Sequence, residues 1–267
     1  IDMQGPELRV GVLAEPMTLN EGEVLGLGGK GIPLPEIAIS ALLPGQEVLL
    51  DDGKLLLRVT EQTETGAVAE VLRGGVLRGR KSLALPGADL EPPTMTASDV
   101  ENIRVAASCG VTGVMQPFVR SRRDLETVRQ ALDENGGANI RLFAKIENQM
   151  GLERLPEFLE TADEIVIARG DLGNAMPLWE LPAAQKRIEA QCRKAGKPFM
   201  VVTQMLASME QNPVPTRAEV SDIFNAVADG AAAVMVTGET AVGKWPVEVI
   251  RYLSNTVQAA ERFLQEG

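Results

Sequence analysis

A regular alternation of strand-like and helix-like stretches begins near residue 92 and runs through the rest of the printed sequence. Short apolar runs predict strands, and the longer stretches between them repeat apolar residues at helical spacing. Five such units in series favour an α/β fold with a parallel sheet, and the strand implied before Gly5 makes six strands. The predicted strands are residues 113–116, 140–144, 164–168, 199–202 and 232–236, and the predicted helices are residues 97–109, 123–134, 152–161, 183–194, 217–229 and 246–265.

The N-terminal part, residues 10–86, has a different pattern of short strands and turns with little helical periodicity. Two apolar runs flank Asp52-Gly53, which is a strong hairpin signal. Residues 67–72 form another strand-like run, followed by Gly74-Gly75. Many short strands joined by glycine turns predict a small β-barrel.

Local signals mark helix ends and the state of the thiols. Ser98 and Thr216 are predicted N-caps, and Pro246 suits the first turn of a helix. Cys109 and Cys192 both fall in helix-like stretches, so we expect two free, buried thiols and no disulfide.

Composition excludes several function classes. The net charge of −11 and the aromatic content of 3% argue against a nucleic-acid partner. The chain has no histidine, which excludes Ser-His-Asp and Cys-His catalysis and histidine metal sites. We find no apolar run of membrane-spanning length and no signal peptide, so we expect a cytoplasmic protein without a membrane partner.

Charged side chains follow two neighbouring predicted strands. Lys145 and Glu147 lie at the end of one strand, and Asp171 comes just after the next. The carboxyl ends of parallel strands meet at one sheet edge, so we expect these three side chains to lie close together. Two carboxylates and a fixed cation suit a divalent metal ion that holds an anionic substrate.

The chain resembles the pyruvate kinase family in six motifs, which occur in the family's order and at about its spacing. They are residues 2–9 (DMQGPELR), 145–148 (KIEN), 168–173 (ARGDLG), 203–206 (TQML), 215–219 (PTRAE) and 237–241 (TGETA). The resemblance implies a (β/α)8 TIM-type barrel with a small β-barrel lid inserted after the third strand. It implies a discontinuous barrel domain at residues 1–9 and 87–267, a lid domain at residues 10–86, and a barrel incomplete at its N-terminus.

The resemblance also implies an activity: a kinase of glycolysis, a transferase that moves a phosphoryl group from phosphoenolpyruvate to ADP to give pyruvate and ATP. Glu147 and Asp171 would hold Mg²⁺ or Mn²⁺, and Lys145 would neutralise charge on the phosphoryl group and the enolate. Gly170 and Asp171 would meet the substrate carboxylate. Thr203 would lie near the carbon that is protonated, where its hydroxyl, a poor acid by its own pKa, would relay a proton through water.

Other matching positions concern the nucleotide and potassium. Arg9, Lys81 and Glu239 match the family's nucleotide side. Asp2 and the backbone carbonyl of Met3 match the potassium site. Glu7 matches the glutamate of potassium-requiring members.

The sequence departs from the family in ways that bear on activity. Met3-Gln4 replaces the usual Thr-Lys, and Pro117 replaces a small hydroxyl residue. The first two barrel strands, with a phosphate-binding arginine, and the C-terminal domain are not in this sequence, so we expect a fragment. Family members are usually homotetramers, which implies a homo-oligomer. Two alternatives stay open: a catalytically incomplete homologue, and a Mg²⁺-dependent aldolase or lyase acting on pyruvate enolate.

Overall fold

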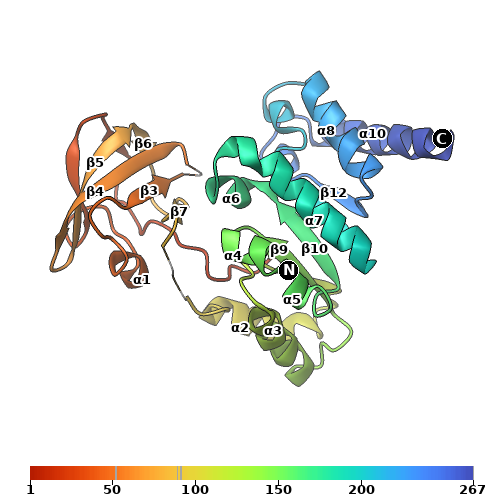
Figure 1. Ribbon diagram of the computed structural model, residues 1–267, viewed down its shortest axis with the longest axis horizontal. Helices are drawn as coiled ribbons and strands as arrows, with labels where there is room; N and C mark the ends of the chain where they lie inside the picture. The colour runs from red at the N-terminus through yellow and green to blue at the C-terminus, as the bar shows by residue number, and fades with distance from the viewer. Residues whose placement is uncertain (52, 89, 91, 267) are drawn as a thin grey trace. The chain divides into compact units, whose positions relative to one another are not determined.

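The computed structural model describes residues 1–51, 53–88, 90 and 92–266. The chain divides into two compact units, coloured in Figure 1 by residue number. The sheet unit comprises Ile1–Met3, Asp99–Gly173 and Trp179–Gly267, and the β unit comprises Gln4–Ser98 and Asn174–Leu178.

The sheet unit contains a five-stranded parallel sheet, as the alternating pattern predicts. Its strands lie in the order β12-β11-β10-β9-β8. Beside β8, Asp2 forms an isolated parallel bridge with Met115, so the strand implied before Gly5 is reduced to this bridge. The strands are β8 (Gly113–Gln116), β9 (Arg141–Ile146), β10 (Glu164–Ala168), β11 (Phe199–Val202) and β12 (Ala233–Met235).

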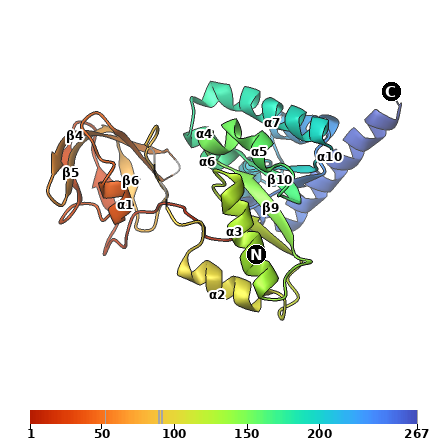
Figure 2. The ribbon, with the colours of Figure 1, turned by 60° about the horizontal axis from the view of Figure 1, so that its bottom comes forward.

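Helices connect and cover these strands. Helices α3, α7 and α8 contact β9, β10 and β12, respectively, and Figure 2 shows α3 and α7 beside the sheet. Helix α10 packs on α8, where the ring centroids of Phe224 and Phe263 lie 5.5 Å apart. The α-helices are α2 (Ala97–Ala106), α3 (Arg122–Glu134), α4 (Gln149–Glu153), α5 (Leu155–Phe158), α6 (Arg169–Asn174), α7 (Leu181–Ala195), α8 (Arg217–Ala228), α9 (Gly238–Ala241) and α10 (Pro246–Glu266). Two 3₁₀ turns are η1 (Leu178–Glu180) and η2 (Ala207–Glu210). No helix in the described part of the chain is long and apolar enough to cross a membrane.

Three local predictions are wrong. The single helix predicted over residues 152–161 is two helices, because Pro156 lacks the N–H that a continuous helix needs and instead lies in the first turn of α5. Ser98 lies inside α2, which begins one residue earlier, and is not its N-cap. Cys109 lies past the end of α2 and is exposed, although both cysteines are free as predicted and Cys192 is buried.

Two predicted helix starts are confirmed. Helix α10 begins at Pro246. Thr216 caps α8 in a capping box, in which its hydroxyl accepts the N–H of Glu219 while the Glu219 carboxylate accepts the N–H of Thr216 at 2.8 Å. The same carboxylate accepts the N–H and the hydroxyl of Ser208, at 2.7 and 2.6 Å, and so fixes η2 to α8.

Replacing Glu219 by glutamine is expected to lower the free energy of unfolding by about 1–2 kcal/mol at pH 7. Burial alone would raise the pKa of Glu219, yet hydrogen bonds from Ser208 and Thr216 outweigh it and lower the pKa. The stabilisation is therefore complete above the usual glutamate pKa of about 4.3 and is lost as the pH falls through the folded-state pKa. Urea unfolding followed by tryptophan fluorescence measures this, because Trp179 and Trp245 both lie in the sheet unit. An equal difference between wild type and variant at every pH would contradict the assignment.

The two faces of the sheet are both buried at its centre. All five residues of β10 are buried, as is typical of a parallel strand covered on both sides. On one face, Val166, Ala168 and Val202 form an apolar cluster against the partly buried Phe143, Met200 and Met235. Val166 is the register partner of Lys145, so Lys145 projects from this same face.

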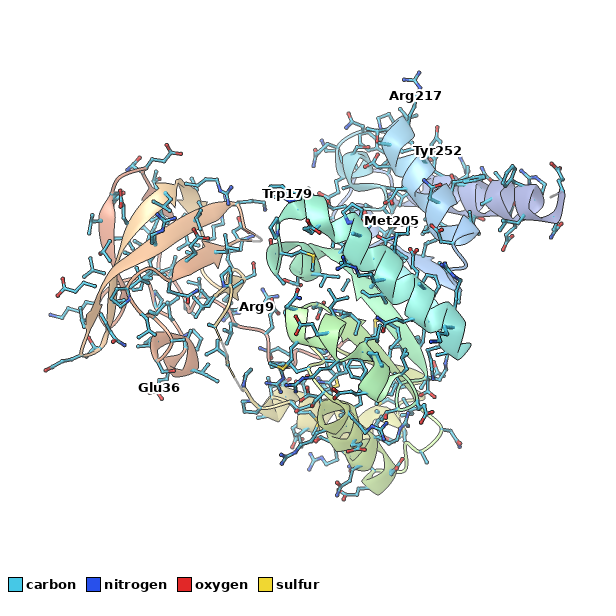
Figure 3. All side chains as sticks on the ribbon, viewed as in Figure 1. Arg9, Glu36, Trp179, Met205, Arg217 and Tyr252 are labelled. Carbon is cyan, nitrogen blue, oxygen red and sulfur yellow. The ribbon has the colours of Figure 1, made fainter. Side chains whose placement is uncertain are left out.

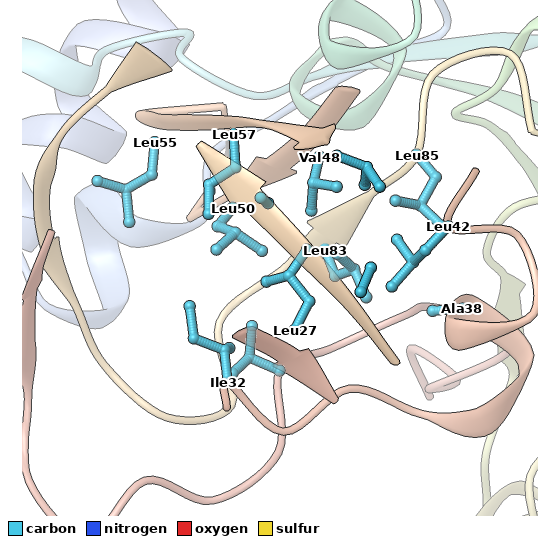
Figure 4. Packing of buried hydrophobic residues seen from close by; sticks show 14 of the residues in the cluster. Leu27, Ile32, Ala38, Leu42, Val48, Leu50, Leu55, Leu57, Leu83 and Leu85 are labelled. Atoms are coloured by element: carbon cyan, nitrogen blue, oxygen red, sulfur yellow. The ribbon is translucent and has the colours of Figure 1, made fainter. Parts of the chain in front are cut away.

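The β unit is built from short antiparallel strands around its own apolar core (Figure 4). A five-stranded sheet has the order β2-β5-β4-β3-β7, and β1 pairs with β6. The strands are β1 (Met17–Leu19), β2 (Val24–Gly28), β3 (Glu47–Leu50), β4 (Leu55–Thr63), β5 (Gly66–Arg73), β6 (Gly75–Leu77) and β7 (Leu83–Ala84), with the short helix α1 (Glu36–Ile39). The predicted hairpin is confirmed, with Leu50 opposite Leu55; Asp52 of its turn lies outside the described residues, and Gly53 has φ +75°.

Candidate functional site

Lys145 and Glu147 meet at the carboxyl end of β9. Strand alternation directs them to one face, and the ammonium of Lys145 lies 3.2 Å from the carboxylate of Glu147. Lys145 also lies 3.4 Å from the carboxylate of Asp2. Glu147 is only 3% exposed, and its other oxygen accepts the N–H of Phe118 at 2.8 Å. The structure thus places a buried carboxylate and a largely buried lysine side by side.

The charges of these groups are strongly coupled. Burial raises the pKa of Glu147 to about 7; Lys145 and the Phe118 N–H oppose the rise, and the charge of Asp171 adds to it. Burial would lower the pKa of Lys145, but the charges of Glu147 and Asp2 outweigh it and raise the pKa. The pair therefore favours the cationic form of Lys145, and burial makes Glu147 harder to ionise than an ordinary glutamate.

Asp171 comes to the site from the next strand. Helix α6 begins at Arg169, directly after β10, and places Asp171 in its first turn. The half-buried Asp171 lies close enough to Glu147 to raise the pKa of that carboxyl.

The donor set tests whether a divalent cation fits this place. In the described part of the chain, no three histidine, cysteine, aspartate or glutamate side chains form a metal-binding group. Mg²⁺ typically takes only one or two protein carboxylates, with water and substrate oxygens completing its shell. Glu147 and Asp171 repel one another, and a cation between them would relieve that repulsion. The chemistry of these two residues fits Mg²⁺ or Mn²⁺.

Thr203 follows β11 in an unusual backbone conformation. Its φ is +83°, a value rare for a β-branched residue, and that of the following Gln204 is +56°; such backbone costs about 1–3 kcal/mol per residue. Gly170 faces it: a Cβ atom on Gly170 would lie 3.1 Å from the Thr203 methyl carbon and 3.6 Å from its hydroxyl oxygen. The structure therefore brings Thr203 next to Gly170, and Gly170 neighbours Asp171 in α6.

Glu239 lies in α9 and is 2% exposed. Its two carboxylate oxygens accept backbone N–H groups, from Leu206 at 3.2 Å and from Thr237 at 2.7 Å. This side chain links the loop after β11 to the turn after β12. Its role on the nucleotide side stays a prediction.

The predicted potassium ligands lie beside β8. Met3 donates its N–H to the carbonyl of Met115 at 3.0 Å, and its side chain is buried. Asp2 is exposed and pairs with Lys145, so it joins the cluster at the end of β9.

Arg9 and Lys81 belong to the β unit. Arg9 forms an ion pair with Glu7 at 2.8 Å, and Lys81 forms one with Asp51 at 2.8 Å. Arg9 pairs with Ser82 in an isolated antiparallel bridge, so the two predicted nucleotide-side cations lie on neighbouring backbone segments.

Sequence reasoning missed two contributors to the site. The Phe118 N–H, which binds Glu147, follows Pro117 and comes from a residue with φ +51°. Arg169 donates to the carbonyl of Thr203 and pairs with Asp222 of α8. The sequence places Arg169 in the predicted site, between Ala168 and Gly170, but it does not indicate the partners of Arg169, which lie 34 or more residues away.

The fold and the site together define a class of protein. Charged side chains gathered at the carboxyl ends of parallel strands are typical of the active sites of α/β enzymes. The family described as "Pyruvate kinase, barrel domain" matches residues 1–250. The chain therefore belongs to the pyruvate kinase family, as its six motifs predict.

Individual relatives agree with this membership. The chain is similar to "Pyruvate kinase" of Agrobacterium vitis, at 40% identity over 98% of this chain and 55% of that protein. It is also 40% identical to "Pyruvate kinase" of Methylorubrum extorquens, over 98% of this chain and 56% of the relative. "Pyruvate kinase" of Bacillus licheniformis is 35% identical over 99% of this chain and 47% of the relative. The chain spans about half the length of the curated relatives it matches.

Proposed function

We propose that this chain carries the reaction centre of a pyruvate kinase, which transfers a phosphoryl group from phosphoenolpyruvate to ADP. The observation that carries the proposal is the Lys145–Glu147 pair at 3.2 Å, with the charge of Asp171 close by. Phosphoryl transfer needs positioning and charge neutralisation more than a strong base, which agrees with a chain that has no histidine.

The proposed fold follows the family. We propose that the five-stranded sheet is an arc of a (β/α)8 barrel and that residues 10–86 are a β-barrel lid inserted into it. The parallel order of β8 to β12 and the separate antiparallel core of the β unit support this interpretation.

The chain's own residues have distinct roles in this reaction. Glu147 and Asp171 would hold Mg²⁺ or Mn²⁺, which supplies charge neutralisation for the bound anions. The cationic Lys145 stabilises negative charge on the phosphoryl group and on the enolate left after transfer. Thr203, beside Gly170, would pass a proton from water to the enolate carbon through its hydroxyl. Gly170, in the first turn of α6, would offer its backbone N–H to the substrate carboxylate.

Remaining parts of the proposal rest on the resemblance. Arg9 and Lys81 would bind nucleotide phosphates, and Lys81 must then exchange its ion pair with Asp51 for a phosphate. Asp2 and the carbonyl of Met3 would take K⁺. A cytoplasmic homo-oligomer is proposed because family members usually are.

The proposal is tested by pyruvate formation from phosphoenolpyruvate and ADP with Mg²⁺ and K⁺, measured on this chain. Formation of pyruvate and ATP in equal amounts supports it. Pyruvate without ATP, with phosphate released in equal amount, would mean that the phosphoryl group passes to water and would contradict its transfer to ADP. If turnover is absent but Mg²⁺-dependent binding of phosphoenolpyruvate is retained, the chain is a catalytically incomplete homologue. This alternative is specific because the chain spans only about half the length of its relatives.

A further inference from the structure

The turn after β11 holds two consecutive non-glycine residues in the left-handed region. Thr203 has φ +83° and Gln204 has φ +56°. Such a backbone persists only where surrounding contacts determine it. The groups that bind the backbone of Thr203 therefore hold this conformation, and with it the direction of the Thr203 side chain.

One side chain makes these contacts. The guanidinium of Arg169 donates two N–H groups to the Thr203 carbonyl oxygen, from Nη2 at 2.6 Å and from Nε at 3.2 Å. Nη2 also lies 2.9 Å from the sulfur of Met205, which is labelled in Figure 3. The third nitrogen, Nη1, pairs with the Asp222 carboxylate of α8 at 2.7 Å. All three guanidinium nitrogens are thus used, and the side chain of Arg169 is only 13% exposed.

Arg169 and its neighbour Gly170 both contact Thr203, one at its carbonyl and the other at its side chain. Arg169 binds the carbonyl of Thr203, and Gly170, which has no Cβ, leaves the space that the Thr203 side chain fills. We infer that Arg169 is a positioning residue, which holds the turn after β11 so that the Thr203 hydroxyl lies beside Gly170. The inference rests on the proposed function for its catalytic meaning, but the geometric part stands without it.

Other charged groups hold the same loop at different points. Glu239 binds the N–H of Leu206, and Glu219 binds Ser208, three and five residues beyond Thr203. Neither contacts Thr203 in the hydrogen bonds described. Glu219→Gln is therefore a matched control, because it loosens the same loop without removing the contact to the Thr203 carbonyl.

The test replaces Arg169 by lysine, which keeps the charge but cannot present a planar fork to one carbonyl and a carboxylate together. Crystal structures of the wild type, Arg169→Lys and Glu219→Gln give the backbone angles. The catalytic readout is exchange of the pyruvate methyl protons for deuterium, followed by NMR with Mg²⁺ and K⁺ present. Binding of Mn²⁺, measured by electron paramagnetic resonance, reports the carboxylate site separately.

We expect Thr203 to leave the left-handed region in Arg169→Lys, with proton exchange reduced about tenfold or more and Mn²⁺ affinity changed less than about twofold. Glu219→Gln should lower thermal stability but retain the wild-type angles and exchange rate. Since Arg169 is largely buried, Asp222→Asn is measured beside it. That variant keeps the bonds to Thr203 but weakens their anchor, so exchange should fall about two- to fivefold.

The outcomes separate this inference from the proposed function. If Arg169→Lys or Asp222→Asn keeps both the wild-type angles and the wild-type exchange rate, the inference is overturned. If the wild type shows no exchange, the proposed function fails for this chain, and the crystal structures alone decide whether Arg169 fixes Thr203. An equal loss of exchange in Glu219→Gln would also overturn the inference, because general loosening of the loop would then suffice.

Discussion

Replacing Lys145 by alanine is expected to lower kcat for pyruvate formation about 10²–10³-fold, with a change of less than about threefold in the KM for phosphoenolpyruvate. Lys145 is cationic because Glu147 and Asp2 raise its pKa, so its charge is fixed before substrate binds. A charge held in place stabilises an enolate that exists only after transfer begins, and such an interaction acts on kcat rather than on binding. Steady-state kinetics with varied phosphoenolpyruvate measures the two constants separately.

The matched control for this variant is Lys194→Ala, which removes a lysine from the exposed end of α7. It loses the same charge at a distance from the carboxylates and should leave both constants unchanged. Equal losses in kcat and in affinity for Lys145→Ala would contradict a transition-state role. A thermal unfolding curve is needed beside the kinetics, because alanine leaves Glu147 buried without its cation.

Much of the sheet unit could be predicted because its signals are local. The apolar runs at residues 113–116, 164–168 and 199–202 correspond to β8, β10 and β11 residue for residue. The pairing of Lys145 with Glu147 follows from the two-residue period of a strand, and the entry of Asp171 from the next strand follows from parallel order. Each of these depends on neighbouring residues or on a simple topological rule.

The missed features depend on contacts between residues far apart in sequence. Arg169 meets Thr203 and Asp222 only after β10, β11 and α8 have packed, and no period in the sequence encodes that meeting. The backbone N–H groups of Leu206 and Thr237 that bind the Glu239 carboxylate also come from a segment that the sequence pattern does not link to α9 and from the residue before it. The exposed Cys109 lies past the end of α2, and helix ends are poorly determined by propensity alone.

Replacing Asp171 by asparagine is expected to raise the Mg²⁺ concentration needed for half-maximal activity about 10- to 100-fold. Asparagine keeps the size and one oxygen but removes the negative charge that attracts the cation. One effect opposes this: Asp171 adds to the raised pKa of Glu147, so its loss makes Glu147 easier to ionise. We expect the direct loss to prevail, because a ligand charge acts on the cation at bonding distance and the repulsion between the carboxylates is weakened by Lys145.

The measurement is a Mg²⁺ titration of pyruvate formation, with Mn²⁺ binding followed independently by electron paramagnetic resonance. Asp133→Asn, which removes one negative charge from an exposed position in α3, controls for the net charge of the chain. Unchanged titrations for Asp171→Asn would remove Asp171 as a ligand and leave Glu147 as the single carboxylate of the site. A steep rise in Asp171→Asn alone would identify the end of β10, together with that of β9, as the place where the cation is held.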